Sequence, residues 1–133
     1  MSDDEKYYQT DEFRNLLEQY EQMMQSGQAR YMDADDLCDI AEYYNLHDAP
    51  VQQVKDVLDY ALKLHPDSTT ALAMKARMAM DEDNMKMAEL IVDSIPDQED
   101  REVYFLRAEM LLRHQRKTMM QVAMDTPKKR LSG

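Results

Sequence analysis

Apolar residues recur at the three- and four-residue spacing of an α-helix along almost the whole chain, and few residues interrupt that spacing. The 133 residues include only two glycines and four prolines, whereas an all-β fold needs turn residues about every 8–12 positions. Helix-favouring residues such as alanine, leucine, methionine and glutamate are abundant instead. The sequence therefore predicts an all-α fold, of a size that one domain can fill.

Capping residues and prolines divide this pattern into about seven helices. Thr10 is expected to cap the first helix, and Gly27 to follow it in the left-handed conformation. The later helices are expected to begin at Asp33, Pro50, Asp67 or Ser68, Asp83 or Asn84, Asp97 and Thr118. Residues 1–9 and 126–133 lack a sustained apolar stripe, so we expect both segments to be loosely held.

The helices repeat in pairs. In the second helix of each pair, equivalent apolar residues are 34 positions apart: Val54 and Ala88, Leu58 and Val92, Ala61 and Ile95. In the first helix, a small residue recurs as Ala41, Ala76 and Ala108. A period near 34 with two helices per unit is typical of tetratricopeptide repeats.

Residues 34–66 resemble one unit of the tetratricopeptide repeat family. The residues that carry the resemblance are Leu37, Ile40, Ala41, Tyr44, Val54, Leu58, Ala61 and Pro66. The resemblance implies a right-handed α-α superhelix of about seven helices in antiparallel hairpins. It divides the chain into a lead and capping helix (1–32), three hairpins (33–67, 68–96 and 97–125) and a basic tail (126–133).

The resemblance also implies a function and a binding face. Members of this family hold a peptide or helix segment of a partner protein on a concave surface, which would make the chain a non-enzymatic scaffold or adaptor. The residues at the concave positions here are Cys38, Glu42, Asn45, Ala73, Arg77, Met80, Phe105, Glu109 and Leu112. The lysine and asparagine that grip a C-terminal carboxylate in chaperone-binding members are replaced by Cys38 and Glu42, so that mode is excluded.

Two of these residues have a second interpretation. Arginine and large aromatic residues often dominate interface energies, which favours Arg77 and Phe105 as partner contacts. Phe105 fits equally well as a core residue, and Arg77 as an ion-pair partner of Glu42 or Glu109. Methionines concentrate in the second hairpin, where they either fill gaps in the core or form an adaptable surface.

The charge distribution argues against nucleic acid as a partner. The formal net charge is −11; residues 113–133 carry six basic residues against Asp125 alone, so the preceding residues hold −16. Such a field repels phosphate backbones. A single cysteine, an acidic start and the absence of a long apolar run predict a cytoplasmic location without membrane contact.

The sequence contains no pattern that indicates an enzyme, a cofactor or a metal. Catalytic and phosphate-binding motifs are missing, and the three histidines are far apart. The acidic run from Asp81 to Asp83 lacks the glycine and glutamate of a calcium loop. Alternatives to the adaptor are a self-assembling homo-oligomer, the N-terminal part of a larger repeat assembly, or an enzyme without a known motif.

Overall fold

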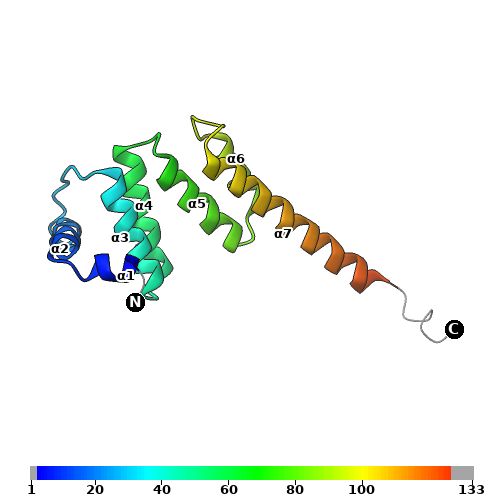
Figure 1. Cartoon of the computed structure of the whole chain (residues 1–133), viewed down its shortest axis with the longest axis horizontal. Coiled ribbons are helices and arrows are strands. Elements are labelled where there is room, and N and C mark those ends of the chain that lie inside the picture. Colours follow the sequence, from blue (N-terminus) through cyan, green and yellow to red (C-terminus); the bar gives the residue numbers. More distant parts are fainter. Residues whose placement is uncertain (1–2, 127–133) are drawn as a thin grey trace.

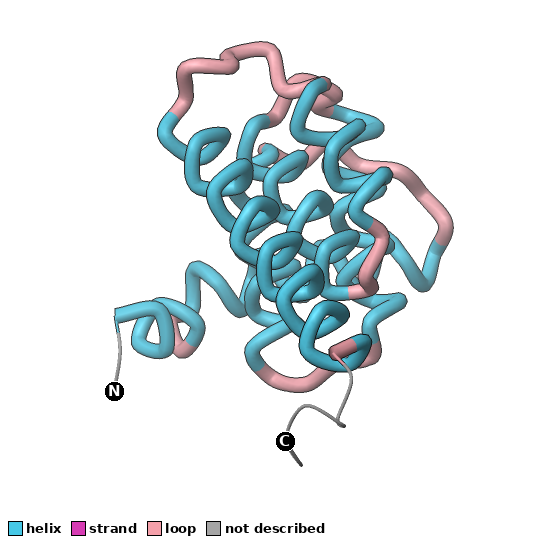
Figure 2. Tube along the Cα trace, turned by 90° about the vertical axis from the view of Figure 1, so that its right-hand side faces the viewer, coloured by secondary structure: helices cyan, strands magenta, loops and turns pink. Residues whose placement is uncertain are grey.

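The computed structural model describes residues 3–126, and every regular element in that range is an α-helix (Figure 2). The helices are α1 (Asp3–Tyr8), α2 (Asp11–Ser26), α3 (Ala34–Leu46), α4 (Val51–Leu64), α5 (Thr69–Asp81), α6 (Met85–Asp93) and α7 (Arg101–Asp125) (Figure 1). The prediction of an all-α chain with packed neighbouring helices is confirmed for this range. The expectation about the tail falls almost entirely on residues 127–133, outside the described residues.

Local capping sets most helix ends where the sequence predicts them. The Thr10 hydroxyl accepts a hydrogen bond from the Phe13 amide at 3.2 Å, and Gly27 ends α2 with a φ of 74°. Ser68 caps α5 in the same way. These contacts satisfy amides and carbonyls that a helix end leaves without partners.

Two hairpins form the centre of the molecule. α3 packs against α4, α5 packs against α6, and α5 also contacts α3, α4 and α7 (Figure 1). Ala41 and Ala76, the small residues of the two first helices, have no exposed surface. A side chain of that size allows two helix backbones to approach closely, as the repeat pattern predicts.

Residues 3–9 are better ordered than the sequence suggests. Residues 3–8 form α1, and the Tyr8 ring is buried at 4.9 Å from Phe13 and 5.3 Å from Tyr43, measured between ring centres. The expectation of a loosely held segment is therefore wrong for this part of the chain. The segment is ordered because its tyrosines join an aromatic cluster between α1, α2 and α3.

The predicted third hairpin (97–125) does not form. One continuous helix, α7, covers residues 101–125, capped by Asp100 rather than by Asp97. Residues 113–118 contain neither glycine nor proline, so nothing stops the helix between the two predicted ones. Ala108, the predicted equivalent of Ala76, is exposed; α7 buries Val103 and Leu106 instead.

The first prediction concerns the helix crossing at Ala76. We expect Ala76→Leu to lower the free energy of unfolding by about 1–3 kcal/mol, because the added carbons have no space there. The exposed Ala108→Leu is the control and should change it by less than about 0.5 kcal/mol. Chemical denaturation of both variants measures the difference, and equal losses would contradict the packing described here.

Candidate functional site

Metal ligands and the cysteine thiol are the reactive groups to consider first in the described residues. No three His, Cys, Asp or Glu side chains in residues 3–126 are placed to hold a metal ion together. Burial raises the pKa of the Cys38 thiol to about 12, so this thiol is not a nucleophile at neutral pH. Within the same range, no helix combines the length and the apolar character needed to cross a membrane. The exposed surfaces of the helices are further candidates.

The structure does not expose the predicted concave row as a whole. Cys38, Ala73 and Met80 are each at most 4% exposed and belong to the two core clusters. Cys38 and Ala73 therefore offer almost no surface to a partner, which corrects that part of the prediction, whereas Met80 borders an open depression with Met85 and Met120. The physical reason is that small and flexible side chains fill the space between crossing helices.

The other predicted positions remain accessible but do not form one surface of a single kind. Phe105 and Leu112 are 56% and 64% exposed, so Phe105 is not a core residue. Glu42 is half-buried beside the Tyr8 hydroxyl, and Asn45 is exposed. A role for these side chains in binding stays a prediction.

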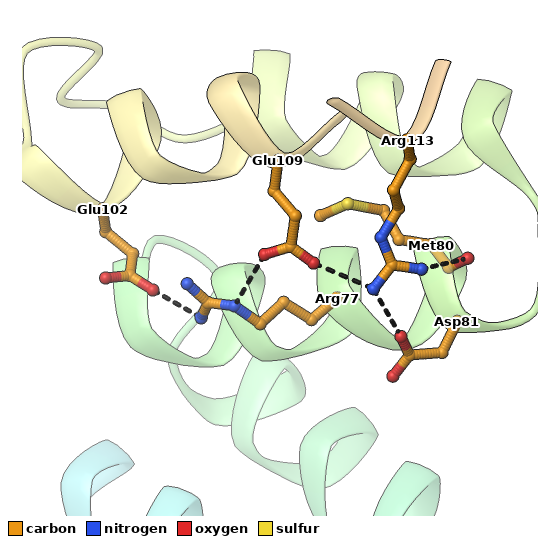
Figure 3. A network of polar contacts seen from close by, with 6 residues as sticks. All are labelled: Arg77, Met80, Asp81, Glu102, Glu109 and Arg113. Atoms are coloured by element: carbon orange, nitrogen blue, oxygen red, sulfur yellow. Dashed lines mark hydrogen bonds and ion pairs between the residues drawn. The ribbon is translucent and has the colours of Figure 1, made fainter. Parts of the chain in front are cut away.

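Arg77 belongs to a network of charges between α5 and α7 (Figure 3). Its guanidinium lies 2.5 Å from a carboxylate oxygen of Glu102 and 3.9 Å from one of Glu109. The alternative interpretation, in which Arg77 pairs with Glu109, is therefore confirmed. An arginine held between two carboxylates is not free to anchor a partner.

Arg113 continues the network toward the end of α5. It donates hydrogen bonds to Glu109 and Asp81, both at 2.9 Å, and to the Met80 carbonyl at 3.1 Å (Figure 3). Positive and negative groups thus alternate along the α5–α7 contact. Each pair is partly exposed, so each contributes about 0–1 kcal/mol, and the network orients α7 more than it stabilises it.

An acidic cluster covers one face of α3. Burial raises the pKa of the Asp39 carboxyl to about 6. Four nearby carboxylates add to this effect: Asp36, Glu42, Asp35 and Asp4. The carboxylates repel one another, and this repulsion makes the charged form of Asp39 unfavourable in the folded chain.

The outer face of α7 is an exposed and mainly apolar feature of the described chain. We use this name for the residues that recur along α7 at alternating steps of three and four: Phe105, Ala108, Leu112, Gln115, Met119 and Val122. All six are exposed. On a helix they lie opposite the buried residues Val103 and Leu106 and the partly buried Met110, so they point away from α5 and α6.

The C-terminal half of α7 has no cover within the described chain. Figure 1 shows it extending past α5 and α6, and every residue from 114 to 125 is exposed. Four large apolar side chains are among them: Met119, Met120, Val122 and Met124. An isolated helix of three turns is marginal in water, and an exposed apolar face usually marks a binding surface.

Open grooves flank this helix. One, of about 410 Å³, lies between α6 and α7 and is lined by Met85, Glu89, Arg107, Met110, Leu111 and His114. A shallow depression along the outer face includes Leu112, Gln115 and Met119. The spacing of three and four from Phe105 to Val122 is visible in the sequence, but only the structure shows that these residues stay exposed.

Comparison with models of protein families, with curated proteins and with solved structures finds no match for this chain.

The second prediction concerns the charge network. We expect Arg77→Glu to lower the free energy of unfolding by about 1–2 kcal/mol, because it removes two pairs and places a third carboxylate beside Glu102 and Glu109. The loss should shrink at high salt, whereas the exposed Arg14→Glu should change stability by less than about 0.5 kcal/mol. Denaturation at low and high salt tests this, and a loss independent of salt would contradict it.

The third prediction concerns pH. The folded-state pKa of Asp39, about 6, lies above its ordinary value of 3.8, so the folded chain binds this proton more tightly than the unfolded chain. This contribution therefore stabilises the fold as pH falls through 6 toward 4 and is lost as pH rises through 6.

The measurement is the thermal midpoint between pH 4 and 8. Asp39→Asn should raise the midpoint at pH 7.5 and flatten its dependence on pH near 6. Glu18→Gln, on the exposed side of α2, is the control. A midpoint that Asp39→Asn leaves unchanged at pH 7.5 would argue against the repulsive cluster.

Proposed function

We propose that this chain is a non-enzymatic protein-interaction module, and that the outer face of α7 is the surface that binds a helical segment of protein. The observation that carries the proposal is the exposure of a row over three successive heptads of one helix that is apolar at every position except Gln115. Alternating steps of three and four keep such a row on one side of a helix and suit it to packing against another helix.

The type of partner follows from the shape of this face. An isolated convex helix offers no enclosed pocket for a small molecule, whereas a second helix can insert its side chains between those of Phe105, Leu112 and Met119. Met119 is flexible and polarizable and can adjust to the side chains that it meets.

The rest of the chain is proposed to act as the support for α7. The 34-residue period and the buried Ala41 and Ala76 are consistent with two tetratricopeptide-like hairpins, α3–α4 and α5–α6, in a short superhelix. α7 then takes the place of the next first helix, held by Val103, Leu106 and the Arg77 network. A cytoplasmic scaffold or adaptor is the role that fits this arrangement.

The fourth prediction compares two exposed methionines of α7. Met119 lies in the outer face and is 71% exposed; Met124 lies outside it and is 77% exposed. We expect Met119→Glu to abolish the capture of partner proteins by the immobilised chain, because a carboxylate between two apolar helix faces loses its hydration. Met124→Glu should leave capture unchanged.

Thermal melting of both variants provides the control for folding. Neither side chain contributes to the core, so both midpoints should stay close to that of the parent chain. Capture that responds equally to both substitutions, or to neither, would reject the outer face of α7 as the binding surface.

A further inference from the structure

We propose that the helix bound by the outer face of α7 is α7 of a second copy of this chain, in antiparallel orientation. This inference rests on the proposed function and identifies the partner. The resulting assembly is a symmetric dimer in which each α7 covers the other.

The outer face is complementary to itself when two copies run in opposite directions. Three kinds of layer then form: Phe105 opposite Val122 of the second copy, Ala108 opposite Met119, and Leu112 opposite Gln115. Each layer combines a larger side chain with a smaller or more flexible one, as efficient packing between facing helices requires.

A parallel pair lacks this complementarity. Identical residues would face each other, which leaves a thin layer at Ala108 and places two amides together at Gln115. Layers of alternating size favour the antiparallel arrangement. The single polar residue, Gln115, disfavours shifted registers that would bury it deeper.

Charged residues beside the two paired outer faces favour the same orientation. In the antiparallel pair, Glu109 lies beside Arg116 of the second copy, and symmetry repeats this contact. Arg116 has no ion pair within residues 3–126, and Glu109 already attracts Arg77 and Arg113. In the parallel pair, Arg116 would lie beside Leu111 and gain no opposite charge.

The distribution of charge over the whole chain agrees with this orientation. Residues 1–100 contain eight basic and 24 acidic residues, a net −16, whereas α7 contains five basic and three acidic ones, a net +2. The C-terminal half of α7, which contains Arg116, extends past α5 and α6 (Figure 1), whereas Arg113 and Lys117 pair with Asp81 and Asp83 of their own chain. Antiparallel pairing brings that half to the body of the second copy, where the field attracts it.

The surface that pairing would cover is large enough for a specific contact. Phe105, Leu112, Met119 and Val122 are each more than half exposed. Two copies therefore bring together eight such side chains, on the order of 1,000 Å², the size at which specific interfaces begin. No described element stands in front of this face, since it lies opposite the stripe that packs on α5 and α6.

The fifth prediction is a concentration-dependent dimer of the full chain. Light scattering after gel filtration, from about 1 μM to 1 mM, should show the mass rising from 15.7 kDa to twice that value. Met119→Glu should weaken self-association at least about tenfold, because it places a carboxylate in the seam opposite Ala108. Met124→Glu should dimerise like the parent chain, and Arg116→Glu should weaken the dimer most at low salt.

Disulfide trapping tests the orientation. One chain carrying Ala108→Cys and another carrying Met119→Cys are mixed and oxidised. We expect a disulfide-linked dimer of the two different chains in preference to a dimer of two identical chains. The parent chain, whose single Cys38 is buried, is the negative control and should not cross-link. Preferential cross-linking of Ala108→Cys with itself would overturn the antiparallel pair.

The outcomes separate the two proposals. A mass that stays at 15.7 kDa, or a dimer that survives Met119→Glu, overturns self-pairing. The interaction module stands after that result if Met119→Glu still abolishes capture of another protein and Met124→Glu does not. It falls if neither self-association nor capture responds to Met119→Glu.

Discussion

The close approach of α5 to its neighbours is the contact on which the rest of the structure depends. α5 packs against α3, α4, α6 and α7, and its buried side chains include four alanines: Ala71, Ala73, Ala76 and Ala79. Small side chains let the backbones of crossing helices come close enough for one helix to serve several partners. A longer side chain at these positions would separate the N-terminal hairpin from α7.

α7 depends on α5 over only half of its length. Val103 and Leu106 are fully packed, and the alternating charges from Glu102 to Arg113 fix the helix against α5. Beyond Arg113 every side chain up to Asp125 is exposed, and an ion pair between Lys117 and Asp83, 3.2 Å apart, links this part of the helix to the turn after α5. The packed half sets the direction of the exposed half, so the rigid contact determines where the outer face is presented.

Electrostatics divide the molecule in a similar way. The acidic excess of residues 1–100 includes the cluster around Asp39, where carboxylates stand close together at a cost to stability at neutral pH. Such an excess discourages contacts between the bodies of two chains. The more basic α7 is the element on which a contact meets the least repulsion.

The sequence by itself determined the helical class, most helix ends and the two central hairpins. Thr10, Gly27, Ser68 and the spacing of apolar residues act within a few positions of the chain, so their effect can be inferred without tertiary structure. Tertiary packing decided the rest. It ordered α1 through the burial of Tyr8. It also buried Cys38, Ala73 and Met80, which the repeat pattern placed on an open groove.

α7 shows the physical reason for this limit. Its sequence carries two apolar rows at helical spacing, one through Val103, Leu106 and Met110 and the other through Phe105, Leu112 and Met119. Periodicity predicts that each row lies along one side of a helix, but it cannot tell which row meets α5. The shape and charge of the facing helix make that choice, and the row that it leaves exposed becomes the candidate surface.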